Sequence, residues 1–225
     1  MKQLIRNNAV FIALSLILLG VLGLALLYIP KGELHLLLNE YHTPARDIFY
    51  RYYTHVAEWF PYVICVALLL FSRIGDGVFA SAAMLLSALF TQVVKHIVVA
   101  PRPLTWFGEH MPDVQLPLVE GVDVHAIYSF PSGHTTSFFA LAFVLSIVAT
   151  KKLSRFSLAL SSTLQAILVV LAALGGYSRI YPCQHFALDV FAGAIVGPLI
   201  TLLCYAVLHR YEGQNWYNYR IFAKK

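Results

Sequence analysis

Residues 8–29 read NAVFIALSLILLGVLGLALLYI, an apolar run that holds no Asp, Glu, Lys or Arg. About 20 apolar residues in a helix cross the roughly 30 Å hydrocarbon core of a bilayer. The run follows Lys2 and Arg6 and so resembles a signal peptide. It is long for one, however, and it ends in Tyr28-Ile29-Pro30 rather than in a small-x-small cleavage site. We therefore expect a retained first membrane span.

The chain as a whole is too apolar for an ordinary soluble protein. Of its 225 residues, 59% are hydrophobic and 12% are charged, and the mean hydropathy is +0.71. Long apolar runs lie at 8–29, 54–72, 77–99, 132–150, 157–177 and 188–208. They lack the alternation of barrel strands, and backbone groups in lipid must bond within their own segment, so helices are expected. The sequence predicts an all-α polytopic membrane protein, one domain over 1–225 with six transmembrane helices in a bundle.

Lysine and arginine are divided unequally between the two sides of this bundle. The terminal segments and two turns hold ten of them, namely Lys2, Arg6, Arg73, Lys151, Lys152, Arg155, Arg210, Arg220, Lys224 and Lys225. The other side holds Lys31, Arg46 and Arg51, besides the three cations of the clusters described below. The positive-inside rule therefore predicts that both termini are cytoplasmic. Because the net charge of +5 is scattered over segment ends and forms no stripe, no nucleic acid partner is predicted.

Two segments on the outer side are longer than simple turns. Residues 30–53 mix leucine with aromatic and basic residues, which predicts an interfacial helix near 31–53. That helix either anchors the chain at the headgroup level or contacts a substrate headgroup, and both readings stay open. Residues 101–130 carry His110 and His125 at an irregular spacing from nearby acids. We expect a solvated loop there, with a role in gating or selecting substrate left open, and no metal site.

Three short polar clusters stand at the outer ends of the apolar runs, where ionisable groups are costly and usually kept for function. The first cluster contains Lys95 and Arg102. Pro101 and Pro103 predict that the third span ends near Val99. Lys95 is then expected to point up from the helix end, with Arg102 folding over from the loop. Taken alone, Lys95 equally fits a lysine that snorkels to the interface.

The second cluster, Pro131-Ser132-Gly133-His134, is typical of a helix start. Ser132 suits the N-cap, and Gly133 lets the backbone approach a ligand closely. Free amides at such a helix end bind anions, and the Ser132 hydroxyl adds a donor. His134 then lies in the first turn, where it can protonate a leaving oxygen. Alone, this tetrapeptide would indicate no more than an ordinary helix cap.

The third cluster contains Ser178-Arg179 with His185 and Asp189. A four-residue step puts His185 and Asp189 on one face if both belong to a helix. A carboxylate beside one imidazole nitrogen leaves the other nitrogen free to attack. Arg179 is expected in the loop that leads into this helix, where its guanidinium can pair with two phosphate oxygens. The three clusters together predict a site that holds a phosphate and transfers it to a histidine.

The patterns Lys-x6-Arg-Pro, Pro-Ser-Gly-His and Ser-Arg-x5-His-x3-Asp resemble the three motifs of the type 2 phosphatidic acid phosphatase superfamily, which also includes soluble vanadium haloperoxidases and acid phosphatases. Every fixed position matches. The resemblance implies that His185 attacks phosphorus to form a phosphohistidine while Asp189 orients it. It implies that His134 protonates the leaving lipid oxygen and later activates water. It also implies that the phosphate oxygens are held by Lys95, Arg102, Ser132, Gly133 and Arg179.

Residues and resemblance together predict a metal-independent phosphatase, without cofactor, that acts on a membrane lipid at the periplasmic face of a bacterial inner membrane. The expected substrate is an envelope lipid such as lipid A or undecaprenyl diphosphate, and phosphatidylglycerol phosphate and phosphatidic acid fit as well. One alternative is a lipid-to-lipid phosphotransferase with the same site. Another is a non-catalytic binder or transporter of anionic lipids, which does not explain the spacing of His185 and Asp189. The sequence makes no prediction of the oligomeric state.

Overall fold

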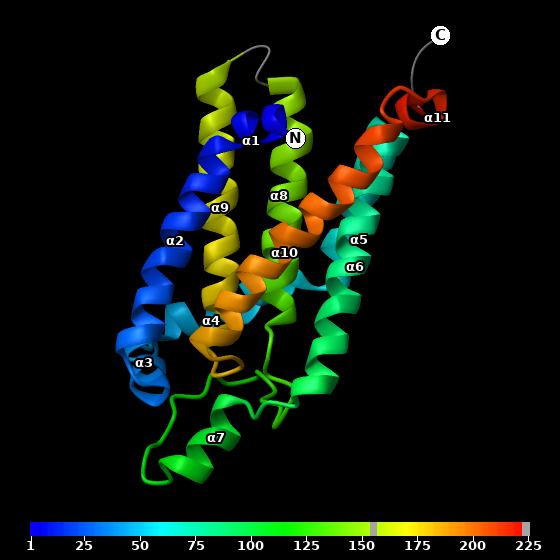
Figure 1. Ribbon diagram of the computed structural model, residues 1–225. Helices are drawn as coiled ribbons and strands as arrows, with labels where there is room; N and C mark the ends of the chain where they lie inside the picture. Colours follow the sequence, from blue (N-terminus) through cyan, green and yellow to red (C-terminus); the bar gives the residue numbers. More distant parts are fainter. Residues whose placement is uncertain (154–156, 222–225) are drawn as a thin grey trace.

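A computed structural model describes residues 1–153 and 157–221, and that part of the chain forms helices and no strand (Figure 1). The elements are α1 (Lys2–Asn7), α2 (Ala9–Tyr28), α3 (Lys31–Leu38), α4 (Pro44–Tyr53), η1 (Thr54–Ala57), α5 (Trp59–Ser72), α6 (Ile74–Val98), α7 (Pro103–His110), α8 (Gly133–Leu153), α9 (Leu158–Ile180), α10 (Ala187–Leu208), η2 (His209–Tyr211) and α11 (Asn215–Asn218). The all-α prediction is confirmed. Of the predicted cytoplasmic cations, Arg155, Lys224 and Lys225 lie outside the described residues.

Five helices are long and apolar enough to cross a membrane, and a sixth span exists if a bent pair counts as one. The predicted span at 54–72 is not one continuous helix. The chain divides there into η1 and α5, and the pair Pro44–Ala57 and Phe60–Ser72 is bent by 47°. Pro61 explains the break, because it cannot donate to the carbonyl of Ala57 and its ring would clash with that carbonyl in a continuous helix. The remaining 14 residues of α5 rise about 21 Å, less than the hydrocarbon thickness.

The segment predicted as one interfacial helix near 31–53 forms two helices, α3 and α4. The division has a local cause at Thr43-Pro44. Pro44 has no N–H to continue a helix from α3, but its fixed φ suits the first position of a new one. Thr43 Oγ1 accepts a hydrogen bond from the backbone N–H of Arg46 at 3.3 Å and caps α4. The 101–130 segment also differs from the predicted loop, because residues Pro103–His110 form α7.

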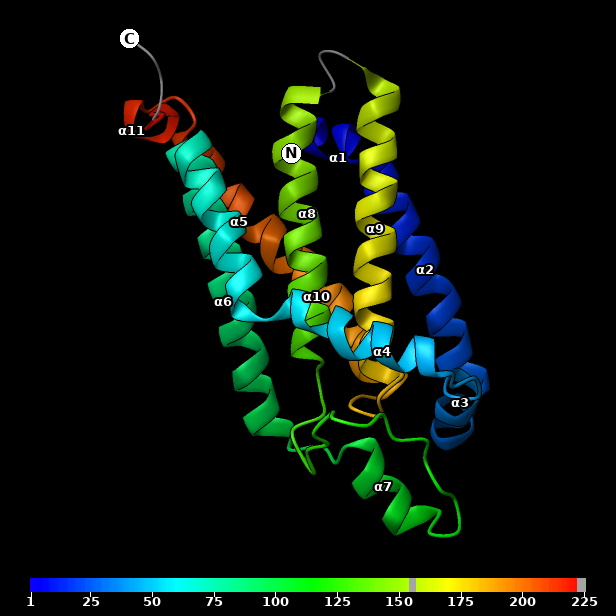
Figure 2. The same ribbon diagram turned by 180° about the vertical axis from the view of Figure 1, so that it is seen from behind.

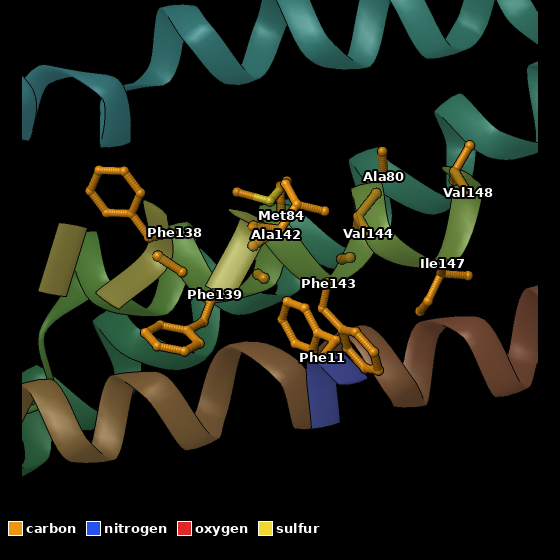
Figure 3. Close-up of a cluster of buried hydrophobic side chains, with 14 of the residues drawn as sticks. Phe11, Ala80, Met84, Phe138, Phe139, Ala142, Phe143, Val144, Ile147 and Val148 are labelled. Carbon is orange, nitrogen blue, oxygen red and sulfur yellow. The ribbon is translucent and has the colours of Figure 1, made fainter. Parts of the chain in front are cut away.

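α8 runs through the middle of the bundle, between α6, α9 and α10 (Figures 1 and 2). Figure 3 shows the apolar core along it, where Phe139, Phe143 and Ile147 are buried. Phe11 of α2 stacks on Phe143 with ring centroids 4.9 Å apart. Since lipid tails are as apolar as these side chains, membrane helices hold together through close packing and small residues. Gly197 of α10 shows this, because a Cβ there would lie 2.3 Å from the carbonyl oxygen of Thr136.

The bundle brings four helix ends together. The C-terminal ends of α6 and α9 and the N-terminal ends of α8 and α10 lie at the lower end in Figure 1, beside α3 and α7. α1 and α11 lie at the opposite end (Figures 1 and 2). The three polar clusters therefore share one end of the molecule, as their positions in the sequence predicted.

Candidate active site

The first cluster reaches over the end of α6. The helix ends at Val98, next to the predicted Val99, which takes a left-handed conformation with φ 45°. Lys95 is 8% exposed, and its Nζ donates to the carbonyl of Tyr128 at 2.6 Å. Arg102 is 7% exposed, and its Nε donates to the carbonyl of Ile127 at 3.1 Å. Both cations are thus buried against neutral carbonyl groups, an arrangement that favours an incoming anion.

Gln184 is a site residue that the sequence reasoning missed. Its Oε1 accepts a hydrogen bond from Arg102 Nη1 at 2.6 Å, and its Nε2 donates to the carbonyl of Asp123 at 2.7 Å. Gln184 is buried and so links Arg102 to the 101–130 segment. Only its place before His185 signals it in the sequence, because its partners lie 82 and 61 residues away.

The second cluster begins α8 as predicted. Ser132 is fully buried, and its Oγ accepts hydrogen bonds from the backbone N–H of Thr135 at 3.3 Å and from Thr135 Oγ1 at 2.8 Å. The N-cap prediction is confirmed, and the hydroxyl hydrogen of Ser132 remains available to donate. Gly133 lies beside Lys95, whose Cε would be 4.0 Å from a Cβ added there. The first amides of the helix have no intrahelical partners and face this cation-rich end.

His134 is half-buried in the first turn of α8, as predicted. It lies within electrostatic range of Lys95, Arg102, Arg179 and His185. The structure therefore brings the histidines of the second and third clusters to the same group of cations.

Arg179 belongs to the last turn of α9 and not to the predicted loop. It is 8% exposed. Its Nη1 donates to Thr54 Oγ1, whereas its buried Nε finds no hydrogen-bond acceptor among the described residues. A buried guanidinium with an unused donor has capacity for one more acceptor, such as a phosphate oxygen. Thr54 was not predicted as a site residue, because it lies 125 residues away in the chain.

His185 and Asp189 do not share a helix, so the four-residue helical step does not account for their contact. α10 begins at Ala187, so His185 lies in the preceding turn, where its backbone N–H bonds the carbonyl of Arg179 at 3.0 Å. His185 Nδ1 still lies 3.4 Å from Asp189 Oδ2, although the two do not form a hydrogen bond of normal geometry. Burial lowers the pKa of His185 to about 3, so its imidazole is neutral and can act as a nucleophile.

The carboxylate of Asp189 is held by two further groups. Its Oδ2 accepts hydrogen bonds from Ser129 Oγ at 2.5 Å and from the backbone N–H of Phe186 at 2.8 Å. In addition, the backbone N–H of Ser132 donates to the carbonyl of Asp189 at 3.0 Å, which joins the starts of α8 and α10. Ser129 was missed from the sequence, since a serine 60 residues from its partner carries no local signal.

His110, one of the two histidines considered for a metal site, has other partners. His110 Nδ1 lies 3.0 Å from the carbonyl of Trp106, and its ring stacks on that indole at 4.5 Å. Among residues 1–153 and 157–221, no three His, Cys, Asp or Glu side chains come close enough to hold a metal ion.

Comparison with known proteins gives several similar chains, among them the following three. Lipid phosphate phosphatase 1 of Arabidopsis thaliana is 31% identical over 155 residues, which are 62% of this chain and 47% of that protein. The chain thus spans about half the length of this relative. Lipid A 4'-phosphatase of Porphyromonas gingivalis is 28% identical over 83% of this chain and 75% of its own length. The crystal structure of LpxE from Aquifex aeolicus superposes with a TM-score of 0.62 at 25% identity, covering 77% of this chain and 93% of LpxE.

The sequence model of the PAP2 superfamily matches residues 76–212, more than half of the chain. The match begins in α6 and runs past α10, so it contains all three clusters. The apolar helices of the chain are long enough to cross a membrane. The chain is therefore an integral membrane protein that belongs to the PAP2 superfamily.

Proposed function

We propose that this protein is a lipid phosphate phosphatase that uses His185 as nucleophile and needs no metal ion. One observation supports this most strongly: Lys95, Arg102 and Arg179 are all buried and bonded to neutral acceptors, and all three lie with His185 within electrostatic range of His134. Burying three cations is costly unless an anion joins them. A phosphate dianion would supply that anion, and it would lie next to the neutral imidazole of His185.

The positions of the groups support the following reaction. Asp189 lies beside Nδ1 of His185 and favours a proton there, which leaves Nε2 to attack phosphorus. As the N–P bond forms, the bond from phosphorus to the lipid oxygen breaks, and His134 gives that oxygen a proton. Water then attacks the phosphorus atom of the phosphohistidine, the N–P bond to His185 breaks, and His134 takes a proton from that water. Inorganic phosphate leaves, and both histidines return to their starting state.

The cations and the start of α8 would stabilise the charge that develops on the phosphoryl oxygens. Lys95, Arg102 and Arg179 supply fixed positive charge in a site of low dielectric, where such charges act strongly. Ser132 and the amides of Gly133 and His134 add donors at the positive end of the helix dipole. These groups supply what a bound metal supplies in other phosphoryl-transfer enzymes.

The proposed substrate is a phosphorylated lipid of the bacterial envelope, either lipid A or undecaprenyl diphosphate, and phosphatidylglycerol phosphate and phosphatidic acid are also candidates. The names of the relatives, a lipid A 4'-phosphatase and a lipid phosphate phosphatase, support a lipid substrate. The unequal distribution of lysine and arginine supports cytoplasmic termini and a site on the periplasmic face of the inner membrane.

Phosphate release from purified protein tests this proposal. The protein in detergent, with excess EDTA, is given each of these lipids in turn, and free inorganic phosphate is measured. Release from at least one lipid in EDTA is expected. An intact, folded protein that binds these lipids and releases no phosphate from any of them would support the anionic-lipid binder instead. Transfer of labelled phosphate to a second lipid, in place of release, would identify a phosphotransferase.

Gln184→Glu tests the role of Arg102. The new carboxylate would pair with the guanidinium and compete with phosphate, so we expect inhibition by inorganic phosphate to weaken by about tenfold. KM for the lipid is expected to rise in parallel. The matched control is Gln115→Glu, which adds the same charge at an exposed position of the 101–130 segment. Equal inhibition constants for both variants would show that Arg102 does not bind the phosphate.

A further inference from the structure

Lys31, the first residue of α3, lies beside the candidate active site without belonging to any of the three clusters. Its Nζ lies 3.9 Å from the centroid of the Phe186 ring and 4.9 Å from that of Trp106. Phe186 directly follows His185, and its backbone N–H is bound by Asp189. The ammonium group is thus held by cation–π contacts over the residue next to the proposed nucleophile.

Packing of α3 against α7 fixes this position. A Cβ on Gly32 would lie 2.9 Å from the sulfur of Met111 and 3.1 Å from the indole of Trp106, so the two helices are in close contact. One turn later, His35 is fully buried between Phe107 and Phe186, with ring centroids 5.6 and 5.1 Å away. The packing of α3 against α7 therefore fixes the place of Lys31 beside the candidate active site.

The charge on Lys31 has no partner of opposite sign in contact among the residues that the structure describes. None of the ion pairs formed within residues 1–153 and 157–221 includes Lys31. Asp189 acts on it only at longer range and is already bonded to Ser129 and Phe186. The residue is exposed, so its ammonium group is open to a ligand from the lipid headgroup region.

One phosphate group does not account for this fourth cation. Lys95, Arg102 and Arg179 carry three positive charges against the single negative charge of Asp189, and the balance matches a phosphate monoester, which carries close to two negative charges near neutral pH. Lys31 adds a further positive charge at the edge of that site.

We propose that Lys31, held over Phe186 and Trp106, binds a second phosphate group of the substrate. The inference rests on the proposed function and narrows it to lipids that carry two phosphates. The second phosphate is either linked directly to the first, as in a lipid diphosphate, or attached elsewhere on the same headgroup, as in a bisphosphorylated glycolipid. The ammonium group then contributes a charge-assisted hydrogen bond that a monophosphate cannot use.

Lys31→Met tests the proposal, because it keeps the length of the side chain and removes its charge. Three substrates are compared in EDTA: an isoprenoid monophosphate, the matching isoprenoid diphosphate, and a bisphosphorylated glycolipid. We expect kcat/KM for one of the two-phosphate lipids to fall by about tenfold or more, while the value for the monophosphate falls by less than threefold. Whichever two-phosphate lipid shows the loss identifies the linkage. Lys31→Arg is expected to keep most of the activity.

Arg46→Met is the matched control, since Arg46 is an exposed cation of α4 whose Nη1 donates to the carbonyl of Tyr41 at 3.1 Å. It is expected to leave all three rates unchanged. Equal losses on all three lipids in Lys31→Met, or no loss on any, would overturn the second-phosphate site. Thermal unfolding of the Lys31→Met protein separates a folding defect from a binding defect. A wild-type protein that hydrolyses none of the lipids would refute the proposed function itself, which is a different result.

Discussion

A His185→Ala protein is expected to release phosphate at least about a thousandfold more slowly than the wild type, because the group that forms the bond to phosphorus is gone. His185 is 2% exposed and lies in a closely packed turn. A second variant, His185→Gln, keeps more of the side-chain volume and is expected to lose as much activity. Initial rates of phosphate release measure both. The matched control is His125→Ala, at an exposed histidine of the 101–130 segment, which should retain full activity.

The two histidines have different roles in the proposed reaction, and the leaving group distinguishes them. A nucleophile is needed for every substrate, so His185→Ala should be inactive on lipid phosphates and on p-nitrophenyl phosphate alike. A general acid matters less when the leaving group is a stable phenolate. His134→Ala is therefore expected to lose much more activity on the lipid than on the aryl phosphate. If the His185→Ala protein kept full activity and still formed a phosphoenzyme that could be trapped, His185 would be excluded as the nucleophile.

Gly197→Ala is expected to destabilise the protein by roughly 3 kcal/mol, close to the upper end of the usual cost of overpacking a core. The added methyl would lie 2.3 Å from the carbonyl oxygen of Thr136 and 2.9 Å from the backbone nitrogen of Ala140. Both atoms belong to the backbone of α8, so they cannot rotate away as a side chain can, and α10 must move. Unfolding in detergent, followed by circular dichroism during heating or titration with denaturant, measures the loss.

The same movement should reach the site. Gly193, one turn before Gly197, faces α8 at the carbonyl of Ser132, where a Cβ would lie 2.7 Å away. The bond from the backbone N–H of Ser132 to the carbonyl of Asp189 spans this contact. Lower activity is therefore expected together with lower stability. Gly20→Ala is the matched control, because a Cβ at Gly20 meets no atom within 4 Å. Equal stability of both variants would contradict the close contact of α8 and α10.

The membrane helices could be predicted because their signal is local. A run such as 8–29 contains its own evidence, since each helix bonds its own backbone and needs only apolar side chains of sufficient length. The signals at the ends of the helices are local as well. Ser132 caps α8, and the prolines after Lys95 end α6 at Val98, one residue before the predicted Val99. The break in the second span was not predicted: the chain divides near Pro61 into η1 and α5, although the apolar run continues across it.

Residues that act through contacts distant in the chain could not be found this way. Ser129 bonds a carboxylate 60 residues away, and Gln184 bonds an arginine 82 residues away. Lys31 is an ordinary basic residue in the sequence, and it gains a site only because α3 and α7 are in contact. None of these residues is part of a repeated spacing, so no pattern in the chain distinguishes them from other polar residues.

The sequence by itself determined that this is a helical membrane protein with its three polar clusters at one end. Hydrophobicity, helix-ending prolines and motif spacing are properties of neighbouring residues, and they can be recognised without any knowledge of packing. Only the tertiary structure decided how the clusters meet. Three features depend on which helix ends the core brings together: the place of His185 in a turn beside Asp189, the hydrogen bond from Ser129 to Asp189, and the position of Lys31 over Phe186. Close contacts such as that of Gly197 with α8 set those distances, and a contact between two helices is a property of neither one alone.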